Sequence, residues 1–283
     1  MVNVLMPKKP HILIIVLVLI VFGAWCVSRF HTKAVTPTPQ QTSVLDRVQK
    51  SGVLRCGYVS FDPYLKKDPN TGKITGVTVD YLEQTAARQG LKIDWAQEIN
   101  IDQVFEAIDY DHIDMFCLPC SPIPAWTARV DFVGSFGKLP YYIYVPYKSK
   151  KTIDDLQTAH FSAVDGYIPT VETPRYFPNA TLTGLPQTAS MAELYDQLKY
   201  EKVDAIINEH VSALNYIRNN PETIRRLNDT PLFTKTMSFP IKKGDVRWGE
   251  FVQRMTDTTL PENQALFRAL NEQYGLTGNA LLY

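Results

Sequence analysis

Short apolar runs alternate with helix-like stretches between residues 53 and 118, and this alternation limits the possible folds more than any other feature of the sequence. Residues 53–59, 91–95 and 113–118 have the length and apolar content of strands. The stretches between them, 79–88 and 101–108, place apolar residues at helical spacing. Strands that are connected through helices usually pair in parallel, so the pattern predicts a parallel sheet flanked by helices.

A second set of elements follows with different spacing. Strand-like runs occupy 141–145, 161–164 and 203–208. Ser190 and Glu193 form a capping-box pattern at the start of a helix, and residues 248–274 are helical with an interruption at Pro261. We therefore expect an α/β chain with two lobes, each a mainly parallel sheet flanked by helices. Ligands of open α/β sheets bind beyond the carboxyl ends of the strands, which indicates the loops after residues 59, 118, 164 and 208.

The amino-terminal segment differs from the rest of the chain. Residues 12–27 contain no charged side chain and follow Lys8 and Lys9. As a helix they would span about 24 Å, slightly less than the hydrocarbon core of a bilayer. We expect residues 1–31 to be a signal peptide or signal-anchor helix, with the remainder outside the cytoplasm. Residues 32–43 are polar and contain proline, which is typical of a linker.

Charge and cysteine content exclude some classes of function. The 29 basic and 29 acidic residues balance, so there is no electrostatic reason to expect nucleic acid. Three cysteines follow the apolar segment, at positions 56, 117 and 120, with no second C-x-x-C and no paired histidines. We expect neither a metal nor another cofactor. Cys56 and Cys117 are interpreted as buried small hydrophobic residues; a bridge from Cys56 to Cys117, from Cys56 to Cys120, or within the C-x-x-C stays open.

Several short motifs occur in a characteristic order. They are L-R-C-G-Y-V at 54–59, D-P-N-T-G-K-I-T-G-V-T-V-D at 68–80, I-D at 113–114, V-D-F at 130–132, V-D-A-I-I at 203–207 and F-P-I-K-K-G-D at 239–245. Together they resemble the family 3 extracellular solute-binding proteins, the amino-acid-type receptors of ABC importers with the type II periplasmic binding fold. The resemblance implies two crossings between lobes. Lobe one would be 44–140 plus 240–283 and lobe two 141–239, with hinge strands near 142–145 and 234–239.

The resemblance also implies a function. The protein would be a receptor and not an enzyme, on the periplasmic side of the bacterial inner membrane, anchored by a single pass or secreted to the periplasm if the signal is cleaved. It would capture a small molecule between its lobes for an inner-membrane ABC permease or a sensor. Two alternatives are a binding-degenerate, membrane-tethered interaction scaffold and an enzyme similar to the cyclohexadienyl dehydratases.

The expected ligand site departs from the family pattern. The family places T-P-E-R before V-D-F, and its arginine pairs with the α-carboxylate of the ligand. Here the four residues are I-P-A-W, so Trp126 stands where the arginine is expected. Tryptophan offers one N–H and a large apolar face. Whether Arg129 substitutes from another direction is left open. We therefore expect an amino-acid-like ligand, polar or amphipathic, that is not a standard α-amino acid.

The remaining candidates follow from the same resemblance. Glu209 falls where an acid binds the ligand's amino group, and Ser121 falls at a hydroxyl position. Gly166 is retained at a helix start, where Thr170 is a shifted replacement for the usual hydroxyl. The full set of expected ligand-binding residues is Phe61, Tyr64, Cys120, Ser121, Trp126, Gly166, Tyr167, Thr170 and Glu209.

Overall fold

The computed structural model describes residues 43–276. The expected signal or anchor segment, 1–31, and the linker up to residue 42 lie outside the described residues. Within 43–276, no helix has both the length and the apolar character needed to cross a membrane.

The first sheet is built around the predicted β-α-β-α-β unit. Strand β1 (Val53–Tyr58) pairs in parallel with β4 (Lys92–Glu98) and with β5 (Met115–Phe116), which confirms the predicted parallel arrangement. Two later strands, β6 (Val130–Val133) and β13 (Phe239–Lys242), complete the order β4-β1-β5-β13-β6. Strand β13 runs antiparallel to β5 and β6, so the chain returns to this sheet near its end.

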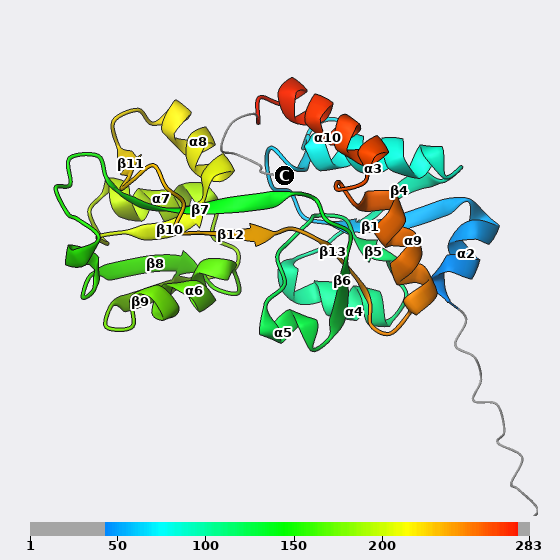
Figure 1. Ribbon diagram of the computed structural model, residues 1–283, viewed down its shortest axis with the longest axis horizontal. Coiled ribbons are helices and arrows are strands. Elements are labelled where there is room, and N and C mark those ends of the chain that lie inside the picture. Colours follow the sequence, from blue (N-terminus) through cyan, green and yellow to red (C-terminus); the bar gives the residue numbers. More distant parts are fainter. Residues whose placement is uncertain (1–42, 277–283) are drawn as a thin grey trace, which may run out of the picture. The chain divides into compact units, whose positions relative to one another are not determined.

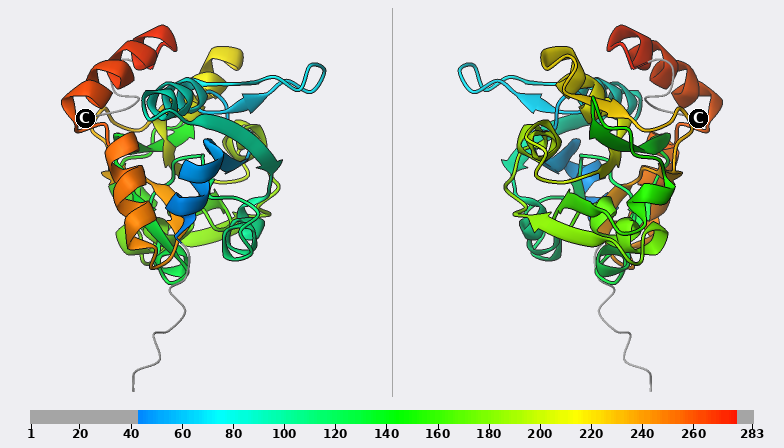
Figure 2. Two further views of the ribbon diagram at one scale, coloured as in Figure 1. Left: turned by 90° about the vertical axis from the view of Figure 1, so that its right-hand side faces the viewer. Right: turned by 90° about the vertical axis from the view of Figure 1, so that its left-hand side faces the viewer.

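Helices cover both sides of the first sheet. In Figure 1, α3 and α10 lie above it and α4 and α5 lie below it. Helix α10 packs against α3, and α9 packs against α2, as the left view of Figure 2 shows. The bounds are α2 (Val44–Ser51), α3 (Val77–Arg88), α4 (Val104–Asp109), α5 (Pro124–Thr127), α9 (Val246–Thr256) and α10 (Pro261–Gln273). A short hairpin of β2 (Lys66–Lys67) and β3 (Ile74–Thr75) precedes α3.

The second sheet is organised around one long strand. Strand β7 (Lys138–Pro146) pairs antiparallel with β10 (Ile206–Glu209), β11 (Ile224–Arg226) and β12 (Phe233–Thr236). A separate parallel pair is formed by β8 (His160–Val164) and β9 (Thr181–Leu185), with α6 (Ile168–Tyr176), α7 (Met191–Lys199) and α8 (His210–Asn219) around them.

The prediction of a mainly parallel sheet in the second half was therefore wrong. Strand β7 leads the chain out of the first sheet and β12 leads it back, so the two strands lie side by side in opposite directions (Figure 1). The interior of β7 is buried on both faces from Leu139 to Val145. Such a continuous apolar run predicts a buried strand but carries no information on the direction of its partners.

The V-D-F and F-P-I-K-K-G-D motifs meet at one end of the first sheet. The Asp131 carboxylate accepts a hydrogen bond from the backbone amide of Gly244 at 2.8 Å. The next residue, Asp245, caps α9 by accepting from the Trp248 amide at 3.1 Å. It also accepts from the Ser43 hydroxyl at 2.7 Å, which ties the start of α2 to the start of α9. These motif residues hold the carboxy-terminal helices against the sheet.

Cys56 and Cys117 form a disulfide with a Cα–Cα separation of 5.4 Å. Both residues are fully buried, as expected, and of the three bridges that the sequence left open the one from Cys56 to Cys117 is present. Cys56 lies beside Met115 in the β1–β5 pair, so Cys117 comes two residues later on the neighbouring chain segment. The pairing of neighbouring strands brings the two cysteines within bonding range. The spacing of the cysteines in the sequence could not show which of them would pair. Cys120 is free.

Candidate functional site

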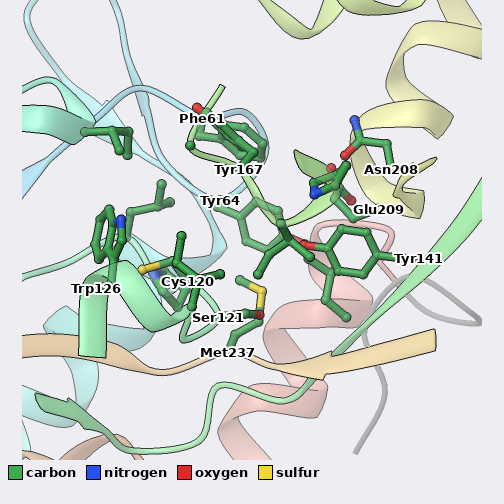
Figure 3. A pocket seen from close by; sticks show the side chains of 18 of the residues that line it. Phe61, Tyr64, Cys120, Ser121, Trp126, Tyr141, Tyr167, Asn208, Glu209 and Met237 are labelled. Atoms are coloured by element: carbon green, nitrogen blue, oxygen red, sulfur yellow. The ribbon is translucent and has the colours of Figure 1, made fainter. Parts of the chain in front are cut away.

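One pocket gathers the four loops that the sequence indicated. It has a volume of about 110 Å³, and Figure 3 shows most of its side chains. Its lining consists of Phe61, Tyr64, Ile101, Phe116, Leu118, Pro119, Cys120, Ser121, Ile123, Trp126, Leu139, Tyr141, Gly166, Tyr167, Ile168, Pro169, Asn208, Glu209 and Met237. All expected ligand-binding residues except Thr170 are in this set. That they bind a ligand stays a prediction.

Trp126 forms one wall and is also part of the core. It is 8% exposed, and its ring meets the ring of Phe105 edge-on at a centroid distance of 4.9 Å. The ring of Phe132, from the V-D-F motif, is tilted against the Trp126 ring at a centroid distance of 6.2 Å. Helix α5 begins with a proline, whose fixed φ suits the first helical position, and so presents Trp126 to the pocket.

Arg129 does not take the place of the missing arginine. Its guanidinium donates to the Asp109 carboxylate at 2.9 Å and lies 4.6 Å from the centre of the Phe105 ring. Arg129 is not among the residues that line the pocket. The loop after β5 therefore brings no cationic group to the pocket.

The loop after β1 supplies two aromatic walls. Phe61 and Tyr64 have ring centroids 6.0 Å apart, and the backbone of Phe61 closes the loop by donating to the Leu65 carbonyl at 2.6 Å. A Cβ on Gly76 would collide with the Tyr64 carbonyl, so this close approach requires glycine. The loop is thus held against the start of α3 with Tyr64 only 1% exposed.

Two buried hydroxyls in the pocket lack a hydrogen-bond partner within residues 43–276. They are the Tyr64 phenol and the Ser121 hydroxyl, and both residues line the pocket. Burial raises the pKa of Tyr64 well above its ordinary value, and the nearby Glu209 charge adds to the effect. Unpaired buried polar groups are uncommon in folded proteins, and in a pocket they indicate where a ligand could bond.

The start of α6 contributes Gly166 and Tyr167. Gly166 has a φ of 81°, a left-handed conformation that favours glycine. Tyr167 stands at the capping position of α6, without a side-chain capping hydrogen bond, and lines the pocket. Thr170 instead turns back on its helix, because its hydroxyl donates to the Tyr167 carbonyl at 2.6 Å. The structure gives no support to Thr170 as a replacement for the family's hydroxyl.

Glu209 is the only charged residue among the described residues that line the pocket. It ends β10 and caps α8: its carboxylate accepts from the amides of Val211 at 2.6 Å and Ser212 at 2.9 Å. The residue is 4% exposed. Burial raises the pKa of Glu209, and the hydrogen bonds from Ser212 and Val211 partly oppose the rise. The amino end of α8 adds a favourable dipole for an anion at this place.

Several lining residues were not expected from the sequence. Leu139 and Tyr141 come from β7, and Met237 precedes β13. Asn208 comes just before Glu209, and its amide donates to the Tyr195 hydroxyl at 2.9 Å. Leu139, Tyr141 and Met237 lie in or near the expected hinge strands, which was the only sequence signal for them. The sequence does not show which face of a buried strand lines a pocket, because this depends on packing.

A second, polar cavity of about 550 Å³ shares Phe61 and Tyr167 with the pocket. Its lining combines the loops after β1 and β4 with the start of α7 and one side of α8, including Asn100, Ser190, Asn215, Asn219 and Asn220. Phe61 and Tyr167 therefore contact both cavities. In the part of the chain that the structure describes, no cluster of His, Cys, Asp and Glu could hold a metal ion.

Comparisons with known proteins agree on one protein family. Residues 54–274 match the family described as bacterial extracellular solute-binding proteins, family 3. A probable histidine-binding protein of Campylobacter jejuni is 26% identical over 164 residues, which are 56% of this chain and 60% of that protein. An L-cystine-binding protein of Bacillus subtilis is 24% identical over 177 residues, which are 61% of this chain and 63% of that protein. The chain thus aligns with about three fifths of the length of these relatives.

Solved structures show the same fold. An ancestral amino acid-binding protein, described as a precursor of cyclohexadienyl dehydratase, superposes with a TM-score of 0.66 at 20% identity, covering 82% of this chain and 99% of that one. A cysteine-binding protein from Campylobacter jejuni gives a TM-score of 0.66 at 18% identity, covering 82% of this chain and 92% of that one. At these identities the likeness establishes the α/β architecture of type II periplasmic binding proteins.

Proposed function

Because the chain belongs to the bacterial extracellular solute-binding proteins of family 3, we propose that it is an extracytoplasmic receptor for a small molecule. It captures the molecule between lobe one, 44–140 plus 240–283, and lobe two, 141–239, and passes it to an inner-membrane ABC permease or a sensor. Its place is the periplasmic side of the inner membrane, tethered by residues 1–31 or released if they are cleaved.

The ligand is amino-acid-like but is not a standard α-amino acid. One observation carries this part of the proposal: Trp126 stands at the expected arginine position, and no described lining residue is Lys, Arg or His. A buried carboxylate needs a charged or multidentate partner, since its desolvation costs several kcal/mol. The two relatives named as histidine- and cystine-binding proteins support the receptor class but not this choice of ligand.

Capture requires the two lobes to move. The crossing strands β7 and β12 are the covalent links between the sheets, and we propose that the lobes close about them. Phe61 from one lobe and Tyr167 from the other both line the pocket, so closure would bring two aromatic walls onto the ligand.

The pocket lining also bears on the two alternative functions. A dehydratase acting on prephenate-like acids would have to hold carboxylates, and the lining described here offers no cation for them. We therefore propose that the chain is not an enzyme. The small volume of the pocket, about 110 Å³, is what favours the alternative of a binding-degenerate scaffold, whose cleft is filled by its own side chains.

Thermal unfolding with a ligand panel tests the proposal. The panel contains the standard L-amino acids, small amines and aromatic metabolites, with prephenate turnover assayed in parallel. A true ligand at ~100-fold excess over its Kd should raise the Tm by about 5–10 °C. The shift should disappear in Glu209→Gln but persist in Glu193→Gln, a matched control in which a helix-capping glutamate lies outside the pocket.

Three results would contradict the proposal in different ways. Strong stabilisation by ordinary L-amino acids would contradict the assigned ligand class. Turnover of prephenate would show an enzyme. No stabilisation by any panel member would favour the scaffold.

A further inference from the structure

The charge balance of the pocket narrows the ligand to a class. The Glu209 carboxylate has about four lone-pair positions; the amides of Val211 and Ser212 occupy two of them, and the Ser212 hydroxyl bonds to a third. At least one oxygen position therefore stays available to a ligand donor. Among the described lining residues, no cation neutralises this buried anion. A ligand ammonium group would supply both the missing charge and the missing N–H donors.

The two unpaired hydroxyls define the other end of the ligand. Tyr64 is 1% exposed and Ser121 is 9% exposed, and neither hydroxyl has a partner within the described residues. Each can donate one hydrogen bond and accept others, so together they suit a neutral group that both donates and accepts. Tyr64, Ser121 and Glu209 all line the same pocket of about 110 Å³, as Figure 3 shows, so a molecule that fills the pocket contacts all three.

On this basis we propose that the ligand is a small organic cation without a carboxylate. Its ammonium group meets Glu209, its neutral polar group, such as a carboxamide, meets Tyr64 and Ser121, and its short apolar body lies against Trp126 and Phe116. This inference rests on the proposed receptor function and deepens it by naming the ligand class.

A carboxylate at the same place would be unfavourable. Its partners would be two neutral hydroxyls, and Glu209 would be a like charge in the same apolar enclosure. Arg129, the nearest cation along the loop, is already paired with Asp109 and lies outside the lining. The pocket therefore distinguishes an amino acid from its amide by electrostatics, without requiring a difference in shape.

Matched ligands provide a direct experiment. Isothermal titration calorimetry on the full chain would compare L-leucine, L-leucinamide and 3-methylbutylamine, and in parallel L-phenylalanine, L-phenylalaninamide and 2-phenylethylamine. We expect the amide to bind best, the amine next and the acid weakest. The amide should bind at least about tenfold more tightly than the acid, because the acid leaves a buried charge without a partner.

Isosteric variants separate the hydroxyl contacts from general packing. Tyr64→Phe and Ser121→Ala should each reduce the preference for amide over amine by about fivefold or more, in line with one lost hydrogen bond. Ser162→Ala is the matched control, because Ser162 is also a buried serine with an unpaired hydroxyl but lies outside the pocket. It should leave the amide-to-amine ratio as in the parent chain.

The outcomes separate this inference from the receptor function. Binding of an L-amino acid as tight as that of its amide overturns the inference and leaves the receptor standing. Failure of all six compounds, or an unchanged ratio in both Tyr64→Phe and Ser121→Ala, also overturns it. The receptor function itself fails only if the whole thermal panel produces no ligand.

Discussion

Two adjacent residues at the end of β10 respond to burial in opposite directions. Burial raises the pKa of Glu209, whereas burial and then the charge of Arg226 lower the pKa of His210 to about 4. The His210 ring accepts or donates at Nδ1 with the Tyr144 hydroxyl at 2.8 Å and is 7% exposed. His210 is therefore neutral in the folded chain at neutral pH, beside a carboxylate that is costly to bury.

His210 should make stability fall on acidification. Between its ordinary pKa of 6.5 and the folded value of about 4, the unfolded chain binds a proton that the folded chain does not. The free energy of unfolding should therefore drop as pH falls through this window, by at most about 1.4 kcal/mol per pH unit from this residue. Denaturant titrations of the parent chain and His210→Asn at several pH values measure the difference.

Comparing the parent chain with His210→Asn separates the pH dependence due to His210 from that due to Glu209. Because the pKa of Glu209 is raised in the folded chain, the folded chain binds this proton at a higher pH than the unfolded chain does. Glu209 therefore makes the free energy of unfolding rise as pH falls, in the parent chain and in the variant alike. The variant should show a shallower loss of stability between pH 6.5 and 4. Equal slopes for parent and variant would show that His210 has no such role.

At the scale of elements, the disulfide joins two neighbouring strands of the first sheet. Cys56 and Cys117 are 61 residues apart in sequence, so their bond closes a long loop of the unfolded chain. The double variant Cys56→Ala, Cys117→Ala should lose about 2–4 kcal/mol of stability. Urea unfolding measures this loss, with Cys120→Ala as the control that removes a thiol but no bridge. A double variant as stable as the control would contradict the expectation.

The sequence predicted those elements whose signals are local. The Ser190–Glu193 capping box begins α7, and its hydroxyl accepts from the Glu193 amide at 3.2 Å. The directions around β7 and the short strands β11 and β12 were not predictable, because they are defined by partners distant in sequence. The disulfide was left open for the same reason, since only the pairing of β1 with β5 brings Cys56 and Cys117 together.

The candidate site was predicted to the extent that its residues directly follow strands. Ser121 after β5 and Glu209 at the end of β10 are examples, because a residue at the end of a strand lies at the edge of its sheet, where open α/β sheets bind ligands. Tyr141 and Met237 were missed, since they belong to the crossing segments and face the pocket only through the packing of the two sheets. Thr170 was misplaced because a threonine hydroxyl can bond within its own helix instead of projecting outward.

At the scale of the whole described chain, residues from both sheets enclose one apolar pocket with a single charge. The loops after β1 and β5 bring Tyr64, Ser121 and Trp126, the loop after β8 brings Tyr167, and the end of β10 brings Glu209. A receptor that closes on its ligand needs binding residues from both lobes, because a site that is complete only when the lobes meet couples binding to closure. Under the proposed function, the Glu209 charge and the two unpaired hydroxyls would decide which molecule stabilises the closed form.

Native mass spectrometry of the full chain tests the central claim most directly. The chain would be purified without denaturation, incubated with the ligand panel, and any bound molecule released and identified. The account predicts one small molecule per chain that carries an amine and no free carboxylate, and that is lost from Glu209→Gln. One standard L-amino acid per chain, or only the mass of the unliganded chain after incubation with every panel member, would contradict it.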